Sequence, residues 1–211
     1  MKEYIKIETP FNRDMNGTKK LIEGDWRNET VKYLADNKWI CTEKVDGTNC
    51  SIVWDGHKVS FHGRTERAQI PSHLANKLFE MFGGETNEQI FEQKFGETPV
   101  ILYGEGYGVK IQNGGNYRDD VSFILFDVLI DDIWLKRESV EDIAKAFDID
   151  VVPIIVYGTL KEAIDYVKQK PTSHIGKCIA PMEGLVCRPE TELYDRLGKR
   201  VIVKVKVRNF D

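Results

Sequence analysis

Short segments of alternating or continuous apolar residues recur along the chain and predict β-strands. The expected strands are residues 39–44, 49–54, 58–62, 99–104, 122–130, 151–157, 183–188 and 200–207. The dipeptide Asp55-Gly56 lies between two of them. Aspartate and glycine tolerate the backbone angles of a tight turn, so these two strands are expected to form a hairpin.

Helical patterns are fewer than strand patterns. One amphipathic stretch has the spacing i, i+4, i+7, i+8 at Leu74, Leu78, Met81 and Phe82. It is expected to form a helix that ends at Gly83-Gly84, because glycine stops helices. Two pairs resemble capping boxes that open short helices, namely Ser139 with Asp142 and Thr159 with Glu162. The fold class expected is therefore α+β, with largely antiparallel sheets flanked by helices.

The last expected strand, within KRVIVKVKVRNF, separates apolar from basic residues. One face carries Val201, Val203, Val205 and Val207, and the other carries Ile202, Lys204, Lys206 and Arg208. Two ammonium groups at alternate positions, Lys204 and Lys206, can bind one anion. The alternative is an edge strand whose lysines keep it soluble.

Composition narrows the possible partners. The 211 residues include 30 Lys and Arg against 34 Asp and Glu, a formal net charge of -4. This balance excludes a protein that coats nucleic acid with a uniformly basic surface. A polyanion must therefore be bound by a local cluster of basic residues. The sequence has no apolar run long enough for a membrane span, no apolar signal core at its start, and no CxxC among its four cysteines. A reduced, cytoplasmic protein without membrane or zinc is expected.

The segment TEKVDGTN carries a candidate nucleophile, Lys44, at the end of an expected strand. An ordinary lysine has a pKa of about 10.4, so only about one in a thousand is neutral near pH 7.4. The amine attacks phosphorus or carbon only when neutral, and nearby cations such as Lys204 and Lys206 favour the neutral form. Gly47 allows the backbone to turn sharply beside a ligand. The alternative is a surface hairpin with a polar turn.

Three carboxylates stand at comparable strand ends: Asp46, Glu105 in GEGYG, and Glu183 in MEGLV. A dinucleotide-binding GxGxxG is excluded because Val109 stands where the last glycine is needed, and there is no P-loop motif. Carboxylates can hold Mg²⁺ directly or through water, and lysines can hold the phosphate under attack. Phe126, in an apolar run, is either a core residue or a platform for a planar base.

In order, EKVDGTN, GEGYG, ILFDV, MEGLV and VKVK resemble five motifs of the covalent nucleotidyltransferase superfamily, which comprises ATP-dependent RNA and DNA ligases and mRNA capping enzymes. Together with GRT and the terminal KVKVRNF, they are most similar to RNA ligases of the phage RNA ligase 2 type and their bacterial relatives. The resemblance implies one nucleotidyltransferase (ATP-grasp-like ligase) domain over residues 1–211, without an appended OB or helical C-terminal domain.

The resemblance also implies residue roles. Lys44 would attack the α-phosphate of ATP, releasing pyrophosphate and forming lysyl-AMP. The other nucleotide-binding residues would be Glu43 (adenine edge), Phe126 (adenine stacking), Glu105 (ribose), Arg64 (ribose or the 5′-phosphate strand), Asn49 (phosphate chain or 5′-phosphate end), and Lys204 and Lys206 (α-phosphate). Mg²⁺ or Mn²⁺ would be held by Glu183, with Asp46 and Glu105 reaching its waters.

The implied reaction then transfers AMP to a 5′-phosphate, and a 3′-hydroxyl displaces it. RNA ends are the preferred substrate, acted on in the cytoplasm, or in a host cytoplasm if the protein is phage-encoded. Asp46 stands where some ligases of this type carry histidine and where DNA ligases carry aspartate, so a minimal DNA nick ligase is an alternative. Further alternatives are a capping guanylyltransferase and a self-adenylylating nucleotide-binding module that needs an accessory protein to seal ends.

Overall fold

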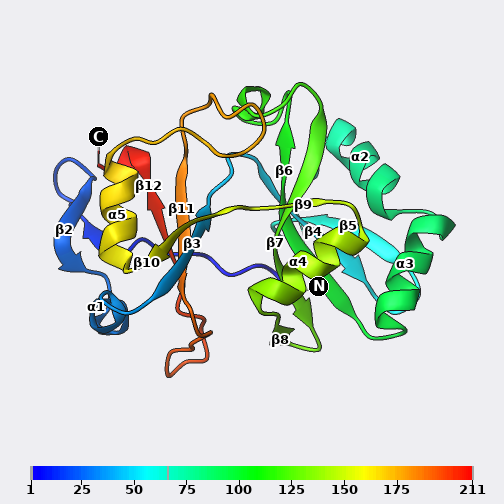
Figure 1. Ribbon diagram of the computed structural model, residues 1–211, viewed down its shortest axis with the longest axis horizontal. Helices are drawn as coiled ribbons and strands as arrows, with labels where there is room; N and C mark the ends of the chain where they lie inside the picture. The colour runs from blue at the N-terminus through cyan, green and yellow to red at the C-terminus, as the bar shows by residue number, and fades with distance from the viewer. Residues whose placement is uncertain (1, 66, 211) are drawn as a thin grey trace. The chain divides into compact units, whose positions relative to one another are not determined.

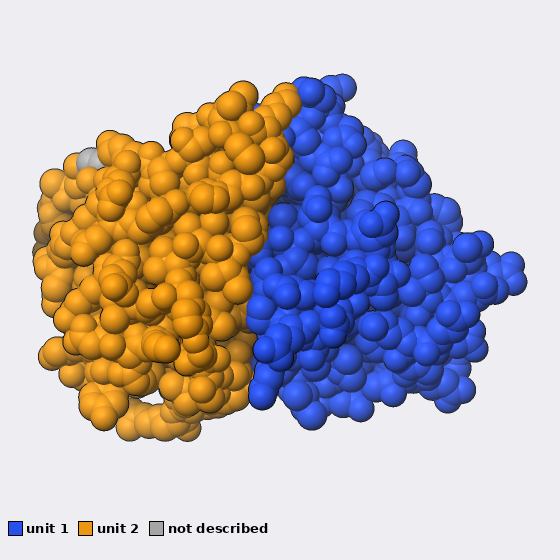
Figure 2. All heavy atoms as spheres, in the orientation of Figure 1, with its two compact units in different colours: residues 1–5, 46–152 blue, residues 6–45, 153–211 orange. Residues whose placement is uncertain are grey.

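The structure of the protein is a computed structural model that describes residues 2–65 and 67–210 (Figure 1). The chain divides into two compact units, coloured separately in Figure 2. Unit 1 comprises residues 1–5 and 46–152, and unit 2 comprises residues 6–45 and 153–211. Each unit has its own sheet and its own hydrophobic core. The α+β class with mostly antiparallel strands is confirmed.

Unit 1 is built on a six-stranded sheet of order β5-β4-β6-β7-β8, in which β9 pairs with β7. Its strands are β4 (Thr48–Trp54), β5 (Val59–Gly63), β6 (Val100–Gly108), β7 (Val121–Ile130), β8 (Ile133–Trp134) and β9 (Asp150–Val151). Only the β7–β9 pairing among these is parallel. The predicted hairpin is confirmed, and its turn is fixed because Asp55 Oδ1 accepts the backbone N–H groups of His57 and Lys58.

Three helices pack against the core of unit 1: α2 (Ser72–Phe82), α3 (Glu85–Phe95) and α4 (Arg137–Ala146). The α2 helix ends at Gly83 as predicted, and its buried side chains are Leu74, Leu78 and Phe82. Burying each such side chain stabilises the fold by about 1.5–3 kcal/mol. The spacing of apolar residues therefore identified the helix face that the sheet covers.

The start of α4 differs from the prediction. The helix begins at Arg137, and Ser139 lies inside it rather than capping it. The Arg137 Nε atom lies 2.6 Å from Glu141 Oε1, an i,i+4 ion pair that stabilises the added first turn. The predicted capping box at Ser139 and Asp142 is therefore wrong.

Unit 2 contains a four-stranded sheet of order β10-β3-β11-β12 and a separate β1-β2 pair, all antiparallel. Its elements are β1 (Phe11–Arg13), β2 (Leu21–Trp26), α1 (Glu29–Leu34), β3 (Trp39–Glu43), β10 (Ile154–Gly158), α5 (Leu160–Lys168), β11 (Gly184–Pro189) and β12 (Val203–Lys206). The capping box of α5 is confirmed. Thr159 Oγ1 accepts from the backbone of Glu162 at 3.1 Å, and Glu162 Oε2 accepts from the backbone of Thr159 at 2.7 Å.

Two predicted strands have different limits. The segment 151–157 is divided between β9 in unit 1 and β10 in unit 2. The last strand is only residues 203–206, because Val201 donates its N–H to Leu193 outside the strand and Val207–Asn209 form a 3₁₀ turn. Within β12 the predicted alternation holds, with the two valines buried and the two lysines half-buried.

All four cysteines are free thiols. Cys41 on β3 and Cys187 on β11 face each other in the register, and both are buried, as is Cys50. Cys178 is exposed. In residues 2–65 and 67–210, no helix has the length and apolar character that a transmembrane span requires.

Candidate active site

Lys44 follows the last residue of β3, where the strand pairing of unit 2 brings three charged side chains together. Its backbone N–H donates to the carbonyl of Gly184 at 2.9 Å, which ties it to the start of β11. The residue before that strand is Glu183, and Lys206 is the register partner of Gly184 on β12. Three segments far apart in the sequence therefore meet at one end of this sheet.

Glu183 lies between two lysine ammonium groups. Lys44 Nζ is 2.7 Å from Glu183 Oε2, and Lys206 Nζ is 2.5 Å from Glu183 Oε1. The side chains are only 23%, 17% and 14% exposed for Lys44, Glu183 and Lys206, respectively. Two cations share one carboxylate, so the cluster can accept a further anion.

The carboxylate of Glu183 is ionised at neutral pH. Burial raises its pKa, but the charges and hydrogen bonds of Lys44 and Lys206 more than offset burial and bring the pKa below the ordinary 4.5. A lowered folded-state pKa contributes stability above the unfolded pKa, and this stability is lost as the pH falls through the folded value. The lysine cluster is therefore intact at neutral pH.

Lys204 lies on the same strand as Lys206 and is half-buried. Its backbone N–H donates to the carbonyl of Glu8 at 2.9 Å, and Val186 is its register partner on β11. Alternate residues of a strand point to the same face, so Lys204 and Lys206 share one face of β12. This is the paired-lysine arrangement that the sequence predicted.

Glu43, the last residue of β3, is only 1% exposed. Its Oε1 atom accepts from the hydroxyl of Ser173 at 2.5 Å, and its Oε2 atom accepts from the backbone N–H of His174 at 2.8 Å. Burial raises the pKa of Glu43, and the two hydrogen bonds partly oppose that rise. Glu43 is thus a buried carboxylate that accepts from uncharged donors and directly precedes Lys44, the candidate nucleophile. Such a carboxylate is a candidate for ligand recognition.

A second group of predicted site residues lies in unit 1. Asp46 donates its backbone N–H to the hydroxyl oxygen of Tyr117 at 3.2 Å, and its Oδ2 atom accepts from Asn113 Nδ2 at 2.8 Å. Asn49 on β4 is the register partner of Glu105 on β6. The structure therefore places Asn49 beside Glu105 and fixes Asp46 against the loop that follows β6.

Gly47 has no room for a side chain. A Cβ atom there would lie 2.3 Å from the carbonyl oxygen of Gly106 and 2.8 Å from Glu105 Cγ. We expect Gly47→Ala to destabilise the protein by about 1–3 kcal/mol, because the backbone of β6 cannot move aside freely. Thermal unfolding should show a melting temperature lower by roughly 2–12 °C.

The matched control for this prediction is Gly115→Ala, in the loop after β6, where an added Cβ would meet nothing within 4 Å. Its melting temperature is expected to stay close to that of the unmodified protein. Equal melting temperatures for Gly47→Ala and the unmodified protein would contradict the steric account of this turn.

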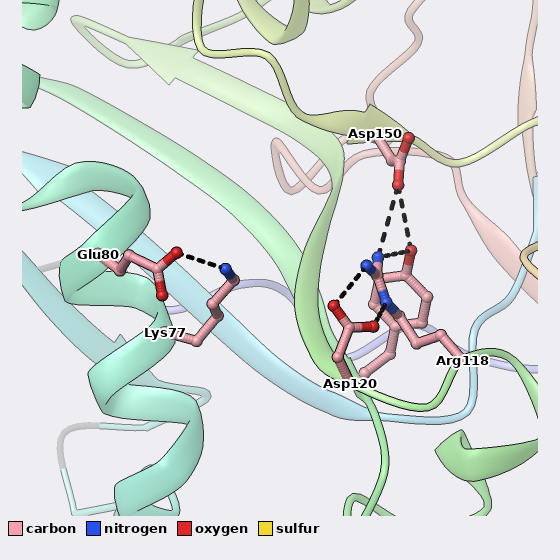
Figure 3. A network of polar contacts seen from close by, with 6 residues as sticks. Lys77, Glu80, Arg118, Asp120 and Asp150 are labelled. Carbon is pink, nitrogen blue, oxygen red and sulfur yellow. Dashed lines mark hydrogen bonds and ion pairs between the residues drawn. The ribbon is translucent and has the colours of Figure 1, made fainter.

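Sequence reasoning missed the polar network that holds the loop after β6 (Figure 3). Arg118 binds both carboxylate oxygens of Asp120, at 2.5 and 2.9 Å, and donates to the hydroxyl of Tyr107 at 3.1 Å. The Tyr107 hydroxyl in turn donates to Asp150 at 3.2 Å. The hydrogen bonds to Asp120 are the main reason that the pKa of Arg118 is raised, although burial opposes them. Arginine and aspartate in such loops are common, so no motif signalled this network.

Phe126 and Arg64 complete the predicted set in unit 1. Phe126 on β7 is half-buried, and its ring meets the Tyr4 ring edge-on with centroids 5.0 Å apart. Arg64 is exposed in the bend directly after β5. Phe126 thus packs partly against the core and is partly exposed, which is compatible with both core packing and base stacking.

Metal binding was predicted for Glu183, Asp46 and Glu105. Within the described residues of each unit, no three His, Cys, Asp or Glu side chains are grouped so that they alone could hold a metal ion. Mg²⁺ usually keeps several waters and binds one or two carboxylates together with substrate phosphates. An ionised carboxylate such as Glu183, beside the ammonium groups of Lys44 and Lys206, fits that mode of binding.

Two largely antiparallel sheets, one ending in a lysine–carboxylate–lysine cluster, give the chain the nucleotidyltransferase fold that RNA ligase structures share. The RNA ligase family matches residues 37–206, a range that contains every residue assigned above. The chain belongs to this family.

Solved structures of Naegleria gruberi RNA ligase share the fold. A variant with ATP and Mn is 18% identical with a TM-score of 0.62, and 84% of this chain matches 52% of that one. A variant with AMP and Mn is 16% identical with a TM-score of 0.62, covering 95% and 60% of the two chains. The protein with PPi is 18% identical with a TM-score of 0.60, covering 98% and 62%. This chain thus spans about half to three-fifths of the length of these ligases.

Proposed function

We propose that the protein is an ATP-dependent RNA ligase of the phage RNA ligase 2 type, which joins 3′-hydroxyl and 5′-phosphate ends through lysyl-AMP. The observation that carries the proposal is the cluster in which Lys44 and Lys206 share the carboxylate of Glu183. Membership of the RNA ligase family supports the reaction class. The Naegleria ligase structures hold ATP and PPi, which are the substrate and the leaving group of the proposed first step, and AMP, which is the nucleotide part of the proposed intermediate.

In that step, Lys44 Nζ attacks the α-phosphorus of ATP. A nitrogen–phosphorus bond forms, the bond from phosphorus to the bridging oxygen breaks, and its electron pair leaves with pyrophosphate. The amine must first lose a proton, which passes to solvent, and the ion pair between Lys44 and Glu183 must open before the nitrogen can reach phosphorus. Incoming phosphate oxygens compete with Glu183 for the ammonium of Lys206, with Lys204 on the same strand face.

A divalent cation, Mg²⁺ or Mn²⁺, supplies charge neutralisation of the triphosphate when it is bound. Glu183 would hold it, with Asp46 and Glu105 reaching its waters. Among the remaining residues, Glu43 would accept from the adenine amino group, Glu105 would bind the ribose, Arg64 would bind the ribose or the strand bearing the 5′-phosphate, and Asn49 would align the phosphates.

We expect Phe126→Ala to weaken ATP binding by about 1–3 kcal/mol, because the ring is proposed to stack on adenine. Isothermal titration with ATP measures this effect directly, and thermal unfolding of the same variant measures the cost to the core. A large loss of stability with unchanged ATP affinity would assign Phe126 to packing alone. Phe79→Ala, at an exposed position on α2, is the control for removing an aromatic ring.

Mass spectrometry of the purified protein after incubation with ATP and Mg²⁺ tests the proposal. The expected result is a gain of one AMP on the peptide that contains Lys44. An adduct with GTP but not with ATP would instead indicate a capping guanylyltransferase.

A panel of nicked duplexes with RNA or DNA on either side of the nick then identifies the substrate. Sealing only when RNA forms the ends supports an RNA ligase, and sealing of all-DNA nicks supports a DNA ligase. If the adduct forms but pre-adenylated ends stay open, the chain needs an accessory protein for the final step.

A further inference from the structure

We propose that Ser173 is a positioning residue that sets purine selectivity by holding both carboxylate oxygens of Glu43 as hydrogen-bond acceptors. This inference rests on the proposed function, in which Glu43 contacts the adenine edge. It adds a residue that lies outside the ligase motifs, 130 positions from Glu43 in the sequence.

The direction of each hydrogen bond around Ser173 is fixed by its partners. The backbone N–H of Ile175 can only donate, so Ser173 Oγ accepts from it, at 3.0 Å. The hydroxyl proton is therefore directed to Glu43 Oε1, 2.5 Å away. A third contact, from the Ser173 N–H to the carbonyl of Ala180 at 2.8 Å, anchors the residue. Ser173 is only 2% exposed, so water does not readily replace these partners.

The other oxygen of Glu43 is constrained in the same way. The backbone N–H of His174 donates to Oε2 at 2.8 Å and cannot accept. Each oxygen of the carboxylate thus receives one donor, and each retains a further lone pair. The two donated hydrogen bonds favour the ionised form of Glu43, in which both oxygens act only as acceptors.

This polarity distinguishes two purines. Adenine carries an amino group at position 6, which donates, whereas guanine carries an oxygen there, which accepts. A buried acceptor facing a second acceptor leaves both unsatisfied, and such mismatches are rejected strongly. Without the Ser173 hydroxyl, Oε1 loses its donor and the side chain can rotate or carry a proton toward a 6-oxo group. The selectivity for ATP over GTP should then fall.

The test compares nucleotide selectivity in the full chain carrying Ser173→Ala, Ser173→Thr or Thr172→Ala. Covalent labelling with radiolabelled ATP and GTP is measured under single-turnover conditions with Mg²⁺. We expect Ser173→Ala to lower the ratio of ATP to GTP labelling by about tenfold or more, as loss of a hydrogen bond to a charged group predicts. Ser173→Thr retains a hydroxyl and should restore most of the ratio. Thr172→Ala, at the exposed neighbouring residue, should leave the ratio unchanged.

Equal losses of ATP and GTP labelling in Ser173→Ala, with no change in ratio, would overturn the inference and leave Ser173 a structural role. Equal use of both nucleotides by the unmodified protein would also overturn it. If the unmodified protein forms no adduct, the proposed function fails, and selectivity is then read from equilibrium binding of ATP and GTP to the same variants. Ser173→Cys, with a weaker donor, replaces Ser173→Ala if the alanine variant does not fold.

Discussion

Replacing Lys44 with alanine is expected to reduce AMP–protein adduct formation by more than about 10³-fold, because the variant lacks the proposed nucleophile. The measurement is autoradiography or intact mass of the protein after incubation with ATP and Mg²⁺. Sealing of pre-adenylated ends should persist in part, since the final displacement does not use the amine as a nucleophile. Full adduct formation in Lys44→Ala would refute the assignment.

Lys44→Arg is the matched variant for this prediction. A guanidinium can keep the ion pair with Glu183 but does not lose its proton, so it cannot attack phosphorus. We expect Lys44→Arg to be as inactive as Lys44→Ala in adduct formation while keeping more of the thermal stability. Lys58→Ala, at an exposed position before β5, controls for the loss of a surface lysine and should label normally.

The second large effect is expected for Glu183→Ala, which should slow adduct formation by about 10²-fold or more. The variant would lack the proposed metal contact and the carboxylate that Lys44 and Lys206 share. A Mg²⁺ titration of the adduct rate measures the effect, and the variant should require more metal than the unmodified protein. An unchanged rate across that titration would contradict the proposed metal role of Glu183.

Glu183→Gln separates charge from size at the same position. Because the pKa of Glu183 is lowered below 4.5, its ion pairs contribute to folding above that pH. The difference in unfolding free energy between the unmodified protein and Glu183→Gln should therefore shrink as the pH falls below about 4.5. A difference that stays constant from neutral to acid pH would show that the charge of Glu183 does not stabilise the fold.

Local signals in the sequence predicted elements well where one interaction decides the boundary. Thr159 with Glu162 opens α5 as expected, since both hydrogen bonds of the capping box form. Ser139 with Asp142 has the same pattern, yet α4 starts at Arg137. The sequence pattern alone does not show which residue has the extended backbone that a cap requires.

Elements with few buried residues escaped prediction. The α3 helix buries only Phe91, and α1 is six residues long with two buried side chains. The β1 and β2 strands are mostly exposed beyond Phe11. Their stability comes from pairing and packing with distant residues, which a periodic pattern does not record.

The sequence predicted which residues form the candidate site, but not how they contact one another. Motifs identified Lys44, Glu183 and Lys206, but only the register of β3 with β11 and of β11 with β12 shows that they meet. The hydrogen bond from Ser173 to Glu43 left no signal, because a serine in a loop is common. Side-chain networks of this kind depend on tertiary contacts between segments far apart in the sequence.

The exposed thiol of Cys178 makes the segment that carries Ser173 accessible to site-directed labelling without removal of any other cysteine. Cys41, Cys50 and Cys187 are buried, and burial raises the pKa of Cys50 to about 12, with Glu105 adding to the rise. A maleimide dye should therefore attach at Cys178 alone in the native protein. A change in its emission when ATP is added would then report, in real time, that the segment next to Glu43 responds to nucleotide.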